Sequence, residues 1–246
     1  MHTFESLMRV YRKEGFFSTT RELISYPLYY LYSLFRLNLK PRFSDVDAML
    51  DFAFMGLGGL IAPVQIRSEF SPFMKIIKKF NPKTVLEIGT AQGGTLFAFT
   101  RAAAAFARII SLDLPQGMYG GGYQRWKIPL FRSFALPRQK LYLVRADSHQ
   151  PSSLREVQEK FGGESIDFLF IDGDHSYDGV KRDFEMYSPL VKKGGIIAFH
   201  DIVPNPADST CFVYKFWDEI KASFEHIELV ESWKQNGAGI GLIYRN

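Results

Sequence analysis

The chain contains 246 residues, of which 46% are hydrophobic and 23% are charged. These fractions are typical of globular proteins and exclude the disordered, collagenous and low-complexity classes. The single cysteine, Cys211, excludes an internal disulfide, and the first residues do not match a signal peptide, so we expect a cytoplasmic protein.

The formal net charge is +4, and residues 1–42 account for all of it with seven basic and three acidic side chains. The rest of the chain balances 23 basic against 23 acidic side chains. Because no basic stripe runs through the body of the chain, we expect no nucleic-acid partner.

The first predicted element is a helix with an aromatic stripe. Its longest uncharged stretch, Leu23–Phe35, has 13 residues, whereas a bilayer span needs about 20, so we expect no transmembrane segment. The helix can pack on the domain or on a second copy in a homo-oligomer, or it can make peripheral membrane contact through residues 23–42. Protein packing is the commoner use of such a stripe and is favoured here. The stripe and the basic residues after it are Tyr26, Tyr29, Tyr30, Tyr32, Phe35, Arg36, Lys40 and Arg42.

From residue 68 onward, helical and strand patterns alternate, which predicts right-handed crossovers and a mostly parallel sheet. We expect an α/β fold with a doubly wound, seven-stranded, Rossmann-like sheet over residues 61–246, preceded by a helical extension over residues 1–60. The predicted helices are 68–80, 95–107, 150–160, 179–187 and 212–224. The predicted strands are 84–88, 108–112, 141–144, 166–171, 196–199, 226–229 and 240–244.

Ligands of such sheets bind beyond the carboxyl ends of the strands, so the residues that follow each apolar run are the informative ones. The first strand leads into a turn that contains Gly89, Gly93 and Gly94, where a ligand could approach the backbone at a helix N-terminus. A plain strand-to-helix turn is the structural alternative. Glu87 beside the turn disfavours a pyrophosphate and suits a ligand with an ammonium and a sulfonium group.

Polar residues also follow the second and third strands. Asp113 is placed to accept hydrogen bonds from ribose hydroxyls, and its structural alternative is a turn residue before Pro115. Asp147 and Ser148 are placed to contact an adenine amino group, and their alternative is a helix cap. Three such sites at successive strand ends favour a nucleoside ligand over capping alone.

The densest constellation follows the fourth and fifth strands. Asp172 and His175 lie in IDGDHSY, and His200 and Asp201 lie in AFHD. Carboxylates with an imidazole can hold a divalent cation, and His175 can serve as a general base. In the structural alternative, an aspartate caps the next helix and His200 is a core histidine.

The segments VLEIGTAQGGT, SLDLP, DFLFIDGDHSYDGVKRDF and GGIIAFHDI resemble class I S-adenosylmethionine-dependent methyltransferases. The similarity is greatest to the methyltransferase domain 24 group, with its cephalosporin-hydroxylase-like and macrolide-sugar O-methyltransferase relatives. It covers roughly residues 60–245. It implies O-methylation of a hydroxyl on a small-molecule or sugar acceptor, with S-adenosylmethionine as methyl donor.

By position, the resemblance implies a role for each motif residue. Asp172 and His175 are implied as catalytic residues. Asp172, His200 and Asp201 are implied as ligands of Mg²⁺ or another divalent cation. His200-Asp201 replaces the acidic pair of metal-dependent relatives, which leaves open a His/Asp site or no cation at all. The implied cofactor contacts are Gln65, Glu87, Gly89, Thr90, Gly93, Gly94, Asp113, Asp147 and Ser148.

Three other functions remain open from the sequence. A nicotinamide-dependent oxidoreductase shares the fold, but the GxGxxG spacing is missing and Glu87 disfavours its cofactor. A hydrolase or other metal enzyme could use the Asp/His cluster without a methyl donor, although no GxSxG motif is present. A non-catalytic scaffold that binds S-adenosylmethionine could dock through the basic aromatic N-terminus.

Overall fold

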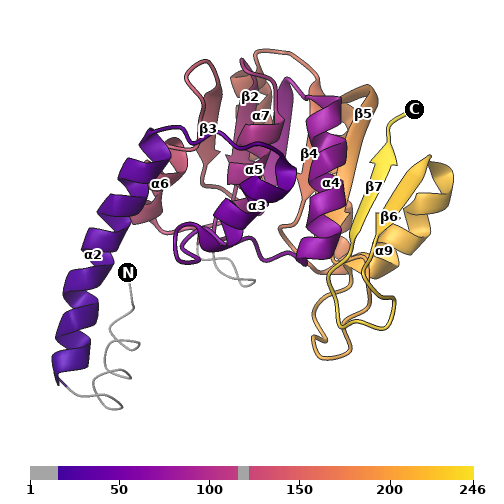
Figure 1. Cartoon of the computed structure of the whole chain (residues 1–246). Helices are drawn as coiled ribbons and strands as arrows, with labels where there is room; N and C mark the ends of the chain where they lie inside the picture. The colour runs from indigo at the N-terminus through magenta and orange to yellow at the C-terminus, as the bar shows by residue number, and fades with distance from the viewer. Residues whose placement is uncertain (1–15, 116–121) are drawn as a thin grey trace. The chain divides into compact units, whose positions relative to one another are not determined.

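The structure, a computed structural model, describes residues 16–115 and 122–246 (Figure 1). The chain divides into two compact units, Met1–Pro41 and Arg42–Asn246, so the predicted boundary at residue 60 falls inside the second unit. The first unit contains α2 (Phe16–Asn38). None of the described helices is long and apolar enough to cross a bilayer.

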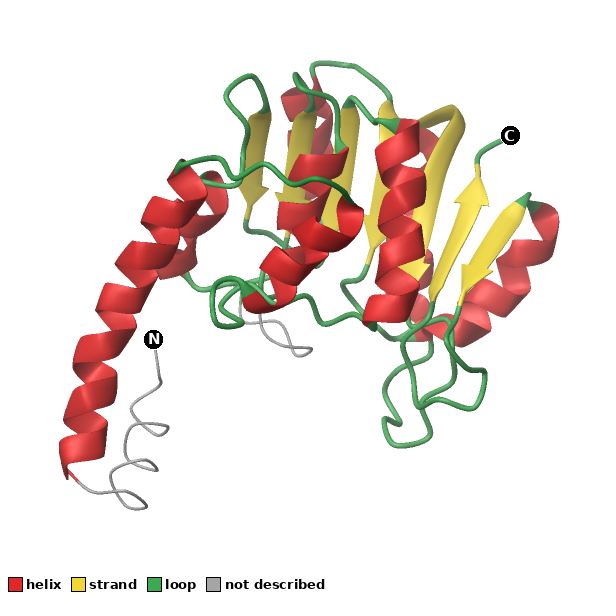
Figure 2. Ribbon diagram, in the orientation of Figure 1, coloured by secondary structure: helices red, strands yellow, loops and turns green. Residues whose placement is uncertain are grey.

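The second unit is built on a seven-stranded sheet in the order β3-β2-β1-β4-β5-β7-β6 (Figure 2). β7 pairs antiparallel with both β5 and β6, and the other pairs are parallel, which confirms the predicted mostly parallel doubly wound sheet. The strands are β1 (Thr84–Ile88), β2 (Arg108–Leu112), β3 (Lys140–Val144), β4 (Ile166–Ile171), β5 (Val191–His200), β6 (His226–Leu229) and β7 (Ile240–Tyr244).

Helices cover both faces of this sheet, because alternate side chains of each strand point to opposite faces. On one face, Phe168 of β4 packs on Phe73 and Phe99, with ring centroids 5.9 and 5.0 Å away. On the other face, Leu169 and its neighbours join a core cluster that includes Trp217. The first face carries α3 (Val46–Met55), α4 (Arg67–Phe80) and α5 (Gly94–Ala102), and the second carries α7 (Pro151–Phe161), α8 (Tyr177–Tyr187) and α9 (Val213–Ile220) (Figure 1).

The shorter described elements join these layers. They are α6 (Ile128–Arg132) and the 3₁₀ turns η1 (Arg125–Lys127), η2 (Ser188–Leu190) and η3 (Lys221–Ser223). β5 is longer than the predicted strand because its pairing with β4 shifts register between Ile166 and Phe168. Gly194, at φ 71°, adopts the left-handed backbone that this irregularity requires.

The strand order brings the carboxyl ends of four strands to one edge of the sheet. β1 lies between β2 and β4, and Ile88 is in register with Leu112 on one side and Ile171 on the other. Leu112 is in turn in register with Val144 of β3. Residues that directly follow these strands therefore meet above the sheet, where the chain reverses its direction of winding.

Candidate functional site

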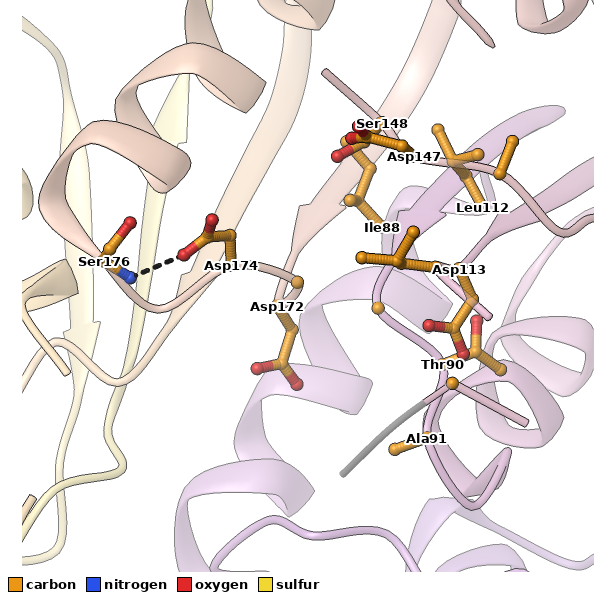
Figure 3. A pocket seen from close by; sticks show the side chains of 15 residues that line it. Ile88, Thr90, Ala91, Leu112, Asp113, Asp147, Ser148, Asp172, Asp174 and Ser176 are labelled. Atoms are coloured by element: carbon orange, nitrogen blue, oxygen red, sulfur yellow. Dashed lines mark hydrogen bonds between the residues drawn. The ribbon is translucent and has the colours of Figure 1, made fainter. Parts of the chain in front are cut away.

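A cavity of about 260 Å³ lies above the carboxyl ends of β1 to β4 (Figure 3). The predicted residues Gly89, Thr90, Asp113, Asp147 and Ser148 all line it, together with Asp172. Residues that follow four strands therefore line one cavity. The residues of the wall that the sequence did not single out are Ile88, Ala91, Leu112, Leu114, Gly122, Ala146, Gly173, Asp174 and Ser176.

Gly89 allows β1 and β4 to meet at the floor of this cavity. Its φ is 86°, and a Cβ there would lie 1.9 Å from the carbonyl oxygen of Asp172. The Asp172 backbone N–H donates to the Ile88 carbonyl at 2.8 Å, which fixes this close approach. A side chain at position 89 would push apart the two strand ends on which the cavity and Asp172 depend.

Gly93 and Gly94, predicted to admit a ligand, do not line the cavity. A Cβ on Gly93 would lie 2.5 Å from the ring of Phe131, and one on Gly94 would lie 2.3 Å from the Ile61 carbonyl oxygen. The space beside both glycines is thus filled by protein. Their role in this structure is to let neighbouring segments pack against the start of α5.

Glu87 is fully buried behind the cavity wall rather than in it. One carboxylate oxygen accepts a hydrogen bond from the Thr90 hydroxyl at 2.7 Å, and the other has no partner among the described residues. Burial raises the pKa of Glu87 to about 8. Thr90, which also lies 2.6 Å from the Ser111 hydroxyl, connects this carboxyl to the cavity.

Asp113 lies on the cavity wall next to Thr90 (Figure 3). The Tyr123 backbone N–H donates to its carboxylate at 3.4 Å. Burial raises the pKa of Asp113 to about 6, although backbone N–H groups of Tyr123, Thr90 and Ala91 favour its ionised form. The carboxylate can accept further hydrogen bonds from hydroxyl groups placed in the cavity.

Asp147 and Ser148 lie on the far wall of the same cavity (Figure 3). Asp147 accepts hydrogen bonds from the His149 backbone N–H at 2.9 Å and from the Gln150 side chain at 2.8 Å. These contacts lower the pKa of Asp147, the Gln150 contact most strongly. Asp147 thus stabilises the loop before α7 rather than capping the helix, because the N-cap is Gln150 and has no side-chain cap hydrogen bond. Both Asp147 and Ser148 line the cavity.

A cluster of two carboxylates and two imidazoles adjoins the cavity. Nδ1 of His200 lies 3.2 Å from Oδ1 of Asp172 and 3.5 Å from Oδ2 of Asp201. Nδ1 of His175 lies 3.2 Å from the same Asp201 oxygen, and its Nε2 lies 3.6 Å from Asp172. Asp172 belongs to both the cavity wall and the cluster, so the two form one continuous site.

Mutual neutralisation governs the electrostatics of this cluster. Burial opposes ionisation of Asp172 and Asp201, but the adjacent imidazoles outweigh it and lower the pKa of both carboxyls. Burial likewise disfavours the charged imidazoles, but the carboxylates raise the pKa of His175 to about 10 and that of His200 well above 6.5. The cluster is therefore a buried network of two carboxylates and two protonated imidazoles.

Two side chains, one just before α4 and one in its first turn, contact the cluster and the loop before β7. Gln65 donates from Nε2 to Oδ2 of Asp172 at 3.0 Å, so it reaches the cluster rather than the cavity wall. Glu69 is buried and accepts hydrogen bonds from the backbone N–H groups of Glu231 and Gly239. This anchors the loop before β7.

The same loop orients Asp201. The Ala238 backbone N–H donates to Oδ1 of Asp201 at 2.9 Å, and Asp201 has a left-handed φ of 62°. Aspartate tolerates this conformation better than most residues. The backbone turn after β5 thus aims the carboxylate back toward His175 and His200.

Sequence reasoning missed Cys211 as a member of this site. The buried Cys211 thiol hydrogen-bonds His175, and the two side chains with Asp201 form a second group of clustered ligand atoms. The Phe212 backbone N–H also donates to the His175 carbonyl at 2.7 Å. Only tertiary structure brings the segments together, and no spacing in the sequence signals this contact.

A family model described as a methyltransferase domain matches residues 86–202. Residues 86–202 are thus similar to the methyltransferase domain family. The matched range includes both the cavity residues from β1 to β4 and the cluster residues Asp172, His175, His200 and Asp201. The sequence resemblance to this family is therefore confirmed for the part of the chain that forms the site.

Individual proteins are similar to parts of this chain. Tapetum-specific methyltransferase 1 of Arabidopsis thaliana is 30% identical over 126 residues, which cover 50% of this chain and 48% of that protein. Caffeoyl-CoA O-methyltransferase of Populus kitakamiensis is 27% identical over 143 residues, which cover 58% of this chain and 55% of that protein. The chain thus spans about half the length of these relatives.

The fold of the domain is similar to that of solved methyltransferases. An O-methyltransferase from Bacillus cereus, crystallised with S-adenosylhomocysteine, superimposes with a TM-score of 0.53 at 18% identity. The superposition covers 83% of this chain and 92% of that one. The Rossmann-like methyltransferase fold predicted from the sequence is therefore confirmed.

Proposed function

We propose that this protein is an S-adenosylmethionine-dependent O-methyltransferase that acts on a hydroxyl of a small molecule or sugar. One observation carries the proposal: Asp172 is shared by a cavity suited to a nucleoside and a cluster suited to proton transfer. The family match over these residues and the similarity to a caffeoyl-CoA O-methyltransferase support the same reaction class.

The residues of the cavity fit the methyl donor. S-adenosylmethionine supplies an electrophilic methyl carbon on a positively charged sulfur. Asp113 would accept hydrogen bonds from the ribose hydroxyls, and Asp147 with Ser148 would contact the adenine. Glu87, buried with an unpartnered carboxylate oxygen beside Thr90, has a pKa of about 8, and the cationic end of the donor would lower that pKa and be stabilised by the resulting carboxylate.

His175 is the proposed general base. Methyl transfer to a hydroxyl requires removal of its proton, and alignment of the two reacting groups supplies much of the acceleration. The side chain of His175 is 21% exposed, whereas that of His200 is 8% exposed, so His175 is the more accessible imidazole of the cluster. Asp201 and Asp172 hold its ring from either side and, despite its burial, raise its pKa to about 10, so the imidazole already carries a proton when no cation is bound. His175 would accept the proton of the acceptor hydroxyl only after it loses its own, which a cation on Asp172, His200 and Asp201 would favour.

The cluster also fits a divalent cation. Carboxylate and imidazole ligands suit several such metals, and Asp172, His200 and Asp201 place one ligand atom each within 4.8 Å of one another. A cation would replace the positive charge of two protonated imidazoles, so the charge of the cluster fits either occupant. We propose these three residues as its ligands. When bound, such an ion lowers the pKa of a coordinated hydroxyl.

The proposed binding of the methyl donor is tested by calorimetry with S-adenosylhomocysteine. Asp113→Asn is expected to weaken binding about tenfold to a hundredfold, the size of a lost hydrogen bond to a charged group. Glu185→Gln, an exposed change on α8, is the matched control. Absence of binding by the unaltered protein, or tighter binding of NAD, would contradict the proposal.

The transfer half is tested with labelled S-adenosylmethionine and a panel of catechol and sugar acceptors. His175→Ala is expected to lower kcat about a hundredfold to ten-thousandfold while the affinity for S-adenosylhomocysteine is unchanged. His226→Ala, on the exposed start of β6, is the control. Equal loss of binding and turnover would indicate a structural role for His175.

The proposed cation is tested by chelation followed by addition of Mg²⁺. Full methyltransferase activity after chelation would exclude the cation from the reaction.

A further inference from the structure

Helix α2 presents a continuous apolar surface that the methyltransferase reaction does not use. Leu28, Leu31, Tyr32, Phe35 and Leu39 are 62, 58, 47, 62 and 63% exposed. Their spacing of three, four and seven residues places them on one side of a helix. Isolated exposed apolar residues are ordinary, but a continuous row of this kind marks an interaction surface. We call these five residues the α2 stripe.

Over residues 27–38, where its side chains are described, α2 is exposed mainly on one side. Ser33 and Leu37, which lie on the opposite side of the helix from the α2 stripe, are both 0% exposed. A helix that was merely solvated would be polar on its exposed side and apolar on its covered side. Here the exposed side is the apolar one, so it requires an apolar partner.

Positive charge accompanies the α2 stripe. Between Leu23 and Arg42 the sequence contains three basic residues and no acidic ones. Arg36 donates to the Tyr32 hydroxyl at 2.6 Å, and its guanidinium lies 5.6 Å from the centre of that ring. This contact holds a basic group at the edge of the apolar surface. Lys40 and Arg42 follow directly after the helix, with Arg42 exposed.

We propose that the α2 stripe docks in the plane of an anionic lipid surface. Aromatic and leucine side chains enter the boundary between headgroups and acyl chains, while flanking basic groups face lipid phosphates. A second copy of the chain fits less well, because self-association would gather positive charge with no acidic residue in the segment to offset it. The proposal is independent of the methyltransferase reaction, since none of the α2 side chains that the structure describes lines the cavity.

The proposal is tested by co-sedimentation of the full chain with vesicles of phosphatidylcholine alone or mixed with phosphatidylserine. We expect binding only to the mixed vesicles, with affinity that falls as salt rises. Phe35→Ser should weaken binding about tenfold, because it removes a large apolar side chain from the lipid. Arg42→Gln should weaken it about fivefold, the usual contribution of one basic residue near such a surface.

Matched controls lie in the larger unit. Phe106→Ser removes an apolar side chain that is 55% exposed, and Lys193→Gln removes an exposed basic group, so neither should change vesicle binding. Unchanged helix content in circular dichroism verifies that Phe35→Ser and Arg42→Gln are folded. No binding to either vesicle, or equal binding to both, overturns the proposal. So does a dimer in light scattering that Phe35→Ser dissociates without any vesicle binding.

Discussion

The two halves of the candidate site hold their carboxyl groups under opposite conditions. In the cavity half, burial without a cationic partner raises the pKa of Glu87 to about 8 and that of Asp113 to about 6. In the cluster half, two imidazoles lower the pKa of Asp172 and Asp201 despite similar burial. The cavity half lacks a positive charge, which a ligand could bring, and the cluster half is neutralised by the protein's own imidazoles.

The comparison predicts that loss of a cluster charge has the largest effect on stability. His200→Ala removes one imidazole from between two buried carboxylates. His175 then remains as the one imidazole that faces both negative charges. We expect the free energy of unfolding in urea at neutral pH to fall by about 3–5 kcal/mol. His226→Ala, which removes an exposed imidazole, should change it by less than about 0.5 kcal/mol. Equal effects of the two substitutions would show that the cluster is not a charge network.

Stability should also depend on pH in a way that separates the two halves. The folded pKa of Glu87, about 8, lies above its ordinary 4.5, so folding favours the protonated acid and stability falls as pH rises through that interval. The folded pKa of His175, about 10, lies above its ordinary 6.5. Its stabilisation is complete below pH 6.5 and is lost as pH rises through about 10.

Glu87→Gln distinguishes these two contributions. The amide cannot ionise, so the loss of stability between pH 4.5 and 8 should diminish while the loss toward pH 10 remains. At pH 9 we expect the variant to be more stable than the unaltered protein by a few kcal/mol, measured by urea unfolding across a pH series. An unaltered pH profile would place the titrating group elsewhere.

Much of the fold follows from local pattern. The strand Ile166–Ile171 was predicted with the observed bounds because an unbroken apolar run is typical of a strand covered on both faces. The helix predicted over residues 95–107 instead ends at Ala102, although the alanines after it favour helix. The Ala104 backbone N–H bonds the Pro82 carbonyl, which turns the chain back toward β2.

The candidate site was predictable only where its residues directly follow strands. Asp113 and Asp172 reach the predicted places because parallel strand ends must meet. Gly93 could not be placed, since the ring of Phe131 that occupies its free space comes from a distant segment. The contact of Cys211 with His175 likewise depends on the path of the chain after β5, which no local pattern encodes.

The smallest expected effect concerns Asp147, and it tests whether this carboxylate serves the loop before α7 more than the ligand. Its carboxylate accepts hydrogen bonds from the His149 N–H and the Gln150 side chain, whereas that of Asp113 accepts from backbone N–H groups. Asp147→Asn keeps an oxygen that can accept a hydrogen bond from the His149 N–H. The free energy of unfolding should therefore change by less than about 0.5 kcal/mol. Asp147→Ala loses both contacts and should lower the free energy of unfolding by about 1 kcal/mol.

Calorimetry should then show a smaller loss of S-adenosylhomocysteine affinity for Asp147→Asn than for Asp113→Asn, because only Asp113 presents a carboxylate without a competing side-chain partner. The reverse order would mean that the third strand end, rather than the second, dominates recognition of the nucleoside.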